Sequence, residues 1–193
     1  RYAEVIEAYL SGLESCDGDL SRVSSVASFF ISRTDTEVDR HLSAIGTPDA
    51  AALRGRTAVA QGQVAYSMFT SAFSGPRWES LTARGARVQR PLWASTSTKD
   101  PSLRDTLYVD ELIGPDTINT LPDITLKAFE DHGTVARTVD ADIEGALSTL
   151  KAVRDLGVDL DAVAHVLEQQ GVAAFIASFD DLIRSLAEKA DTF

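Results

Sequence analysis

Polar residues and a cation follow the first strand-like segment of this chain. Residues Val23 to Ile31 form a short, β-branched and aromatic-rich run, which predicts a buried strand that continues into Ser32 and Arg33. In a parallel α/β sheet, functional sites form at the carboxyl ends of the strands. Alternation there places Ser28, Phe30 and Ser32 on one face. Since a guanidinium can hold a phosphate through two parallel hydrogen bonds, this group suits a polar substrate that carries an anion.

A second strand-like segment, Val88 to Thr96, also ends in small polar residues. Four consecutive hydroxyl residues occupy positions 95–98, and Lys99 follows them. Side chains such as Ser95 and Thr96, together with backbone amides, can hold sugar hydroxyls or phosphate oxygens. Lys99 would supply a cation to the same pocket.

Each of these patterns has a plainer interpretation. Arg33 could be a solvated loop cation paired with Asp35 or Glu37. The hydroxyl run could be an ordinary turn leading into Asp100. A third strand at about residues 117–121 ends in Asn119 and Thr120, which could simply be turn residues.

No residue of this chain is predicted to act as a nucleophile or a metal ligand. Schiff-base chemistry needs a desolvated lysine, held in a strand, whose amine is neutral at working pH. The lysines are Lys99, Lys127, Lys151 and Lys189; the last three lie on amphipathic helices, and Lys99 follows a strand beside an aspartate. The three histidines are far apart and show no metal-ligand spacing, so no metal site is expected.

Composition narrows the class of protein. The 193 residues are enough for one domain with a sizeable core. A formal net charge of −11 argues against nucleic acid and anionic lipid as partners. No apolar run of about 18 residues exists, so no membrane span is expected. A single cysteine, Cys16, favours a reducing compartment, the cytoplasm. Because Arg1 opens directly into an amphipathic pattern, we expect the chain to begin part-way through a longer protein.

Periodicity predicts helices between and after the three strands. The expected elements are a helix at about 1–14, a long helix from Pro48 to Gly75 with Met68 inward, a short helix at 77–84, helices ending at Gly133 and Gly157, and a helix pair at 159–190 broken near Gly171. Pro91 is expected at the beginning of its strand. Long helical crossovers favour parallel strands, so the fold class is α/β. Three strands cannot close a barrel, which needs about eight strands; the chain is either a small open sheet or the last three strand–helix units of a barrel.

Two long blocks of sequence carry a family resemblance. They are SVASFFISRTDTEVD, at Ser25–Asp39, and QRPLWASTSTKDPSLRDTLYVDELIGPDTINTLPDITLKAFEDHG, at Gln89–Gly133. Both resemble the C-terminal half of bacterial transaldolases of the actinobacterial type, and the likeness extends over essentially the whole chain. The resemblance implies one partial domain, residues 1–193, forming the C-terminal part of a (β/α)₈ TIM barrel of the class I aldolase type.

The resemblance also implies a function. Transaldolases transfer a dihydroxyacetone unit from sedoheptulose 7-phosphate to glyceraldehyde 3-phosphate in the pentose phosphate pathway, through a Schiff base and without a cofactor. Fructose 6-phosphate and erythrose 4-phosphate are the sugar-phosphate substrates of the reverse direction.

The resemblance further assigns roles to individual residues. Ser28 matches an active-site serine, Phe30 an aromatic wall residue, and Arg33 a phosphate-binding arginine. Lys99 is the nearest match to a second phosphate-binding cation, with Ser95 and Thr96 as its neighbours in the pocket.

The catalytic half of the family pattern is absent from this chain. The family's Schiff-base lysine and its acid/base partners belong to the first five strands, which would precede Arg1. We therefore expect no turnover without the missing N-terminal half of the barrel. The alternatives are another aldolase-type barrel half, a non-catalytic phosphosugar-binding module, and a protein that only makes interactions.

Overall fold

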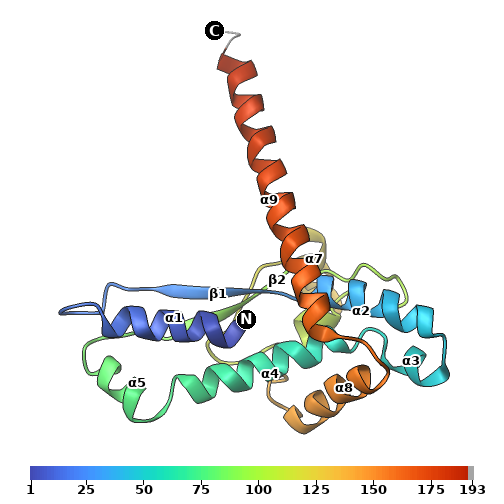
Figure 1. The fold of residues 1–193 in the computed structure, drawn as a ribbon, viewed down its shortest axis with the longest axis horizontal. Coiled ribbons are helices and arrows are strands. Elements are labelled where there is room, and N and C mark those ends of the chain that lie inside the picture. Colours follow the sequence, from blue (N-terminus) through green and yellow to red (C-terminus); the bar gives the residue numbers. More distant parts are fainter. Residues whose placement is uncertain (191–193) are drawn as a thin grey trace. The chain divides into compact units, whose positions relative to one another are not determined.

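The computed structural model describes residues 1–190. The chain divides into two compact units, Arg1–Val158 and Asp159–Phe193. The three strands, the covered core and the candidate site all belong to the first unit (Figure 1). The single partial domain expected over residues 1–193 stays a prediction. Among the described residues, no helix combines the length and the apolar character needed to cross a bilayer.

Three parallel strands form the sheet of the first unit, in the order β1 (Ser25–Phe30), β2 (Gln89–Ala94) and β3 (Ile118–Asn119). In the register, Phe29 lies beside Trp93 and Phe30 beside Ala94. A long helical segment, residues 32–82, joins β1 to β2, and a connection with one four-residue helix, Leu107–Asp110, joins β2 to β3. Both connections are long enough for the crossover that parallel strands require. The predicted α/β class and the parallel arrangement are therefore confirmed.

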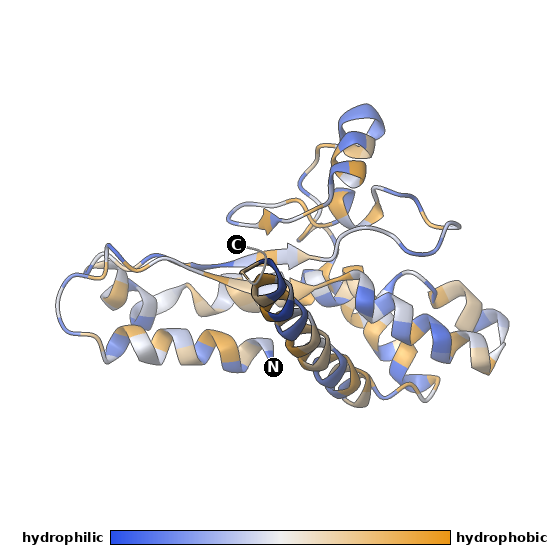
Figure 2. Cartoon of the chain, turned by 90° about the horizontal axis from the view of Figure 1, so that it is seen from above, coloured by the Kyte–Doolittle hydropathy of each residue, from blue (hydrophilic) through white to orange (hydrophobic). Residues whose placement is uncertain are grey.

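Nine helices surround or follow these strands within residues 1–190. They are α1 (Tyr2–Glu14), α2 (Ser32–Ile45), α3 (Pro48–Leu53), α4 (Thr57–Ala72), α5 (Gly75–Thr82), α6 (Leu107–Asp110), α7 (Asp123–His132), α8 (Ile143–Asp155) and α9 (Leu160–Ala190). In the first unit, hydrophobic and hydrophilic bands alternate along the helices, as expected of helices that bury one side (Figure 2).

One face of the sheet is covered by helices, and we call it the covered face. Figure 1 shows α1 and α4 along the same side of β1 and β2. Trp93 is completely buried there, and its indole N–H donates to the carbonyl of Leu112 at 3.0 Å. The ring of Phe29 packs edge-on against Trp93 at 5.9 Å and against Tyr2 at 5.7 Å. These aromatic contacts join the strands to the helical core.

The opposite face, which we call the open face, carries the alternate residues of β1. Val26 is 44% exposed and Phe30 39% exposed, and Ser28 between them is also exposed. Alternation along the strand produces this contrast, because neighbouring side chains point to opposite sides of the sheet. The open face therefore presents two apolar side chains and one hydroxyl.

The first strand ends earlier than its sequence suggested. β1 stops at Phe30, and Ser32 and Arg33 form the beginning of α2. The amide of Ser32 donates to the carbonyl of Ser95 at 3.0 Å, which turns the chain out of the sheet direction. The placement of Ser32 on the strand face was therefore wrong, and Arg33 is a helical residue.

The predicted long helix beginning at Pro48 is two helices. Thr47 does cap the first, because its hydroxyl accepts from the amide of Ala50 at 3.2 Å. Gly55, with φ of +70°, then separates α3 from α4. The break changes the phase of the second helix, so Met68, predicted to be inward, is 37% exposed, whereas Tyr66 and Phe69 are buried.

Pro91 is the third residue of β2, not its first, and this prediction was wrong. The carbonyl of Ala94 accepts from Ile31, after β1, whereas the carbonyl of Trp93 accepts from Thr120, after β3. By alternation, Pro91 directs its backbone nitrogen toward the β3 side. Pairing with β3 begins only at the next residue of β2, so the missing N–H breaks no ladder bond.

The second unit consists of α9 over its described length. This helix continues without interruption through Gly171, where a break was predicted. Apolar side chains recur at helical spacing along its second half and are exposed: Val172, Phe175, Ile176, Phe179, Leu182, Ile183 and Leu186.

Candidate functional site

Three of the sequence-predicted site residues gather at the carboxyl end of β1. Ser28 and Phe30 lie two residues apart and therefore share the open face. The guanidinium carbon of Arg33 lies 4.8 Å from the centre of the Phe30 ring, a cation–π contact. Arg33 comes from the first turn of α2, so the strand end and the helix start together place a cation over an aromatic ring.

The guanidinium of Arg33 is available for a ligand. Within residues 1–190 it has no hydrogen-bond partner and no ion pair. The interaction that it does make there is the cation–π contact with Phe30. The plainer interpretation, pairing with Asp35 or Glu37, is wrong. Glu37 pairs with Arg40 at 2.6 Å, and Asp35 points to other helices. A partly buried guanidinium with open donors can hold an oxyanion through two hydrogen bonds.

Ser95 connects the loop after β2 to the beginning of α2. Its backbone has φ of +58°, a left-handed conformation that is uncommon for a residue with a side chain. Its carbonyl accepts from the amide of Ser32 at 3.0 Å, and the two hydroxyl oxygens lie 2.8 Å apart. Ser95 thus lies beside the turn that carries Arg33.

Thr96 connects β2 to β3. Its side chain is completely buried, and its hydroxyl lies 2.7 Å from the amide oxygen of Asn119 and 3.2 Å from the carbonyl of Thr120. In this structure Thr96 holds two strand ends together. A contact between its hydroxyl and a substrate stays a prediction.

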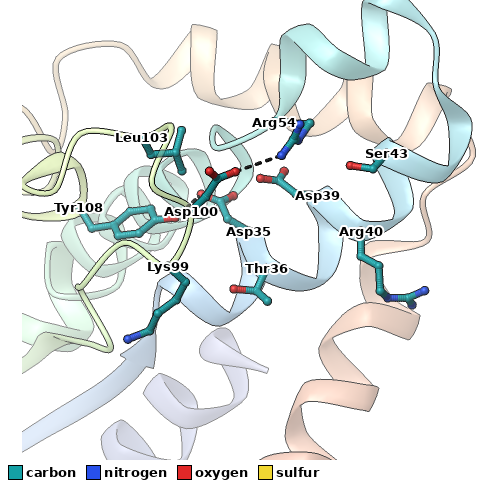
Figure 3. Close-up of a pocket in the computed structure, with 10 residues that line it drawn as sticks. All are labelled: Asp35, Thr36, Asp39, Arg40, Ser43, Arg54, Lys99, Asp100, Leu103 and Tyr108. Atoms are coloured by element: carbon teal, nitrogen blue, oxygen red, sulfur yellow. Dashed lines mark hydrogen bonds and ion pairs between the residues drawn. The ribbon is translucent and has the colours of Figure 1, made fainter.

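Lys99 lies at the edge of a cavity of about 260 Å³ (Figure 3). The lining residues come from α2, from the segment after α3, from the loop after β2 and from α6: Asp35, Thr36, Asp39, Arg40, Ser43, Arg54, Lys99, Asp100, Leu103 and Tyr108. Figure 3 shows the amine of Lys99 directed away from the Asp100 carboxylate, which instead pairs with Arg54 at 3.0 Å. Lys99 therefore keeps an open amine group at the edge of a cavity that is lined by three aspartates and two arginines.

Two of the aspartates that line this cavity are Asp35, which is buried, and Asp39, which is partly buried. Asp35 accepts from the amide of Ala58 and from the hydroxyl of Tyr108, both at 2.8 Å. Burial raises the pKa of Asp35, and these two donors oppose the rise. Asp39 accepts from the amide of Gly55 at 3.0 Å, and burial raises its pKa to about 6.

Sequence reasoning did not assign Asp35 and Tyr108 to the site region. Asp35 was considered only as an ion-pair partner for Arg33, because the two are close in sequence. Its actual partners lie 23 and 73 residues away. The available signal was a polar side chain in the first turn of a helix, where an acid is favourable.

The strand ends of this region carry groups that can bind an oxyanion. The strands of the described chain contain no lysine. Residues 1–190 also contain no group of three or more His, Cys, Asp or Glu side chains arranged to hold a metal ion. What the strand ends offer is an open guanidinium, an aromatic surface and a hydroxyl.

Known proteins match this chain over nearly its full length. Residues 1–186 match a family model described as Transaldolase/Fructose-6-phosphate aldolase. The chain is 51% identical over 193 residues to a protein named transaldolase from Parafrankia sp., and the match covers 98% of this chain and 52% of that protein. It is 50% identical to a transaldolase of Frankia alni and 49% identical to one of Thermobifida fusca, with the same coverage. The chain spans about half the length of the curated relatives it matches.

Proposed function

The chain belongs to the transaldolase/fructose-6-phosphate aldolase family, and on this premise we propose that the complete protein is a transaldolase. It would transfer a dihydroxyacetone unit from sedoheptulose 7-phosphate to glyceraldehyde 3-phosphate. This would place it in the pentose phosphate pathway. The observation that carries the proposal is the sequence identity of about 50% to named transaldolases over 98% of the chain.

The three parallel strands would be the last three of a TIM barrel. Family membership supports this, as does a sheet with one covered face and one open face. In a complete barrel the open face would become the interior, and the carboxyl ends of β1 and β2 would lie at the catalytic rim. Ser28, Phe30 and Arg33 would then line the substrate pocket.

Arg33 would hold the phosphate of the sugar substrates. Its donors are open, its position is supported by Phe30, and a planar fork matches a phosphate oxygen pair. Lys99 would act as a second cation. Because a lysine binds phosphate as a point charge, its contribution should be smaller than that of the arginine.

The Schiff-base lysine would come from the part of the relatives that this chain does not cover. No strand of the described chain carries a lysine, and Lys99 is exposed in a loop. A Schiff-base lysine needs a desolvated position, which an exposed loop does not provide. The binding residues and the reacting residue would therefore belong to different halves of one barrel.

Borohydride trapping on the full-length protein tests this proposal. Incubation with fructose 6-phosphate and borohydride should leave a reduced, covalent adduct on a lysine outside residues 1–193. Arg33→Ala should raise the KM for fructose 6-phosphate by about 10- to 100-fold, the usual loss when a charged hydrogen-bond pair is removed. Trapping with unphosphorylated dihydroxyacetone should stay unchanged in this variant, whereas no adduct in the wild-type protein would refute the proposal.

The 193-residue chain alone gives a second test. We expect no transfer from sedoheptulose 7-phosphate to glyceraldehyde 3-phosphate, and recovery of activity when the missing half is supplied as a separate chain. Turnover by the purified 193-residue chain would contradict the division of roles proposed above.

The family description favours one alternative, an aldolase that cleaves fructose 6-phosphate. The two activities differ in their need for an acceptor. An aldolase releases free dihydroxyacetone without an acceptor aldehyde, whereas a transaldolase keeps the unit bound until an acceptor arrives. Release of dihydroxyacetone from fructose 6-phosphate at the transfer rate, with no aldehyde added, would favour the aldolase.

A further inference from the structure

The first turn of α2 carries Arg33 and is held from two sides. On one side, Ser32 is joined to Ser95 through its amide and its hydroxyl. On the other side, Asp35 is joined to the amide of Ala58, at the beginning of α4, and to Tyr108 in α6. These contacts come from three separate parts of the chain, so tertiary structure fixes this turn.

The carboxylate of Asp35 is well placed to fix the first turn of α2. It is 2% exposed, and each of its two carboxylate oxygens accepts one hydrogen bond at 2.8 Å. Tyr108, its donor, is 1% exposed and lies in a tightly packed region. A buried carboxylate with two short bonds to different helices leaves α2 little freedom to turn or slide.

The side chain of Arg33 lacks such restraint of its own. Arg33 is partly buried, and among residues 1–190 its guanidinium has a cation–π contact with Phe30 but no hydrogen bond or ion pair. The position of the guanidinium therefore depends on where the backbone of the α2 turn places it. Displacement by about 1 Å is enough to spoil a two-pronged contact with an oxyanion.

We propose that Asp35 and Tyr108 are positioning residues that fix the first turn of α2. The guanidinium of Arg33 is then already oriented to bind the phosphate of the substrate. This role rests on the proposed function, because it needs Arg33 to be the phosphate-binding residue. It adds a buried pair that touches neither substrate nor Arg33. The pair acts through the backbone between residues 33 and 35.

Tyr108→Phe in the full-length protein is the sharpest test, because it removes one hydroxyl and keeps the ring. Calorimetric titration with inorganic phosphate should show a dissociation constant about 3- to 10-fold higher than wild type, the effect of a lost buried hydrogen bond. The KM for fructose 6-phosphate should rise by a similar factor, while kcat and trapping with unphosphorylated dihydroxyacetone stay unchanged. Asp35→Asn should act in the same direction, and Tyr108→Phe remains informative if that variant fails to fold.

A double-mutant cycle separates positioning from general stability. In the Arg33→Ala background, Tyr108→Phe should weaken phosphate binding no further, because the group being positioned is gone. The matched control is Tyr66→Phe, on α4. It removes the hydroxyl of another buried tyrosine, which donates to the carbonyl of Pro115 at 3.2 Å, a hydrogen bond that does not involve the α2 turn. The control should lower the thermal midpoint without changing the phosphate dissociation constant.

The outcomes distinguish two failures. If Arg33→Ala weakens phosphate binding but Tyr108→Phe does not, or if the two effects simply add, the positioning role is overturned while the proposed function stands. If the wild-type protein binds no phosphate, or Arg33→Ala changes nothing, the proposed function fails and the positioning role fails with it.

Discussion

The two faces of one small sheet differ in what their side chains contact. On the covered face, Phe29 and Trp93 pack edge-on, and the indole N–H of Trp93 is hydrogen-bonded. On the open face, the hydroxyl of Ser28 and the guanidinium of Arg33 have no hydrogen-bond partner within residues 1–190. Phe29 and Phe30 are neighbours in sequence and lie on opposite faces.

This difference shows how a strand separates stability from binding. A close-packed side chain whose polar groups are already hydrogen-bonded contributes to the free energy of unfolding, and it has no unused donor or acceptor for a ligand. An exposed, unpaired cation contributes little to stability, and it retains its full capacity to bind an anion. Period-two alternation assigns the two tasks to alternate residues, so mutations on the two faces should have different consequences.

The largest effect is expected from Trp93→Ala on the covered face. The substitution leaves a large cavity and removes the hydrogen bond to Leu112, so the free energy of unfolding should fall by about 3–5 kcal/mol. Urea denaturation of the full-length protein would measure it. Phe30→Ala, an aromatic truncation on the open face, is the control. Equal losses for the two variants would show that the faces do not differ in this way.

A smaller effect is expected at Asp39, which lines the cavity beside Lys99. Burial raises the pKa of its carboxyl from 3.8 to about 6, so the folded protein binds a proton more tightly than the unfolded chain. Its contribution to stability is therefore complete below about pH 4 and is lost as the pH rises to about 6.

Asp39→Asn keeps an oxygen for the Gly55 amide and removes the titration. At pH 7 the variant should be more stable than wild type by about 1 kcal/mol, after allowance for partial solvent exposure, and the difference should vanish near pH 4. Thermal unfolding across this pH range is the measurement. A variant that is less stable than wild type at pH 7 would contradict the stated origin of the pKa shift.

Phe30→Leu tests whether the aromatic ring supports Arg33. Leucine preserves an apolar side chain but removes the cation–π contact, worth about 0.5–1 kcal/mol. Phosphate should bind about 2- to 5-fold more weakly, with little change in the free energy of unfolding. Phe30→Tyr, which keeps an aromatic face, serves as the control and should bind phosphate as wild type does. If leucine has no effect, the ring only limits the size of the pocket.

The smallest change in stability is expected from Ser28→Ala. The hydroxyl is exposed and has no partner in the described structure, so the free energy of unfolding should change by less than about 0.5 kcal/mol. The same variant should still slow transfer in the full-length protein if Ser28 contacts the substrate. A loss of stability comparable to that of Trp93→Ala would place Ser28 in the core, contrary to the structure.

Much of the fold could be predicted from local patterns. The strands at residues 25–30 and 89–94, the first helix and the cap at Thr47 follow from side-chain type and spacing, which act over a few residues. Errors arose where a distant contact decided the outcome. The break at Gly55 lies where its amide meets Asp39, 16 residues away, and it reversed the expected burial of Met68.

The candidate site likewise combines residues that the sequence indicated with contacts that only the structure revealed. Residue types alone indicated Ser28, Phe30 and Arg33, because alternation and the chemistry of a guanidinium are local properties. Only the tertiary structure decided that Arg33 is helical and stacked on Phe30, and that Thr96 is buried against Asn119. It alone also showed Asp35 beside Tyr108, since a contact across 73 residues leaves no periodic trace in the sequence. Local preference determined which groups are available, and long-range packing decided which of them stay free.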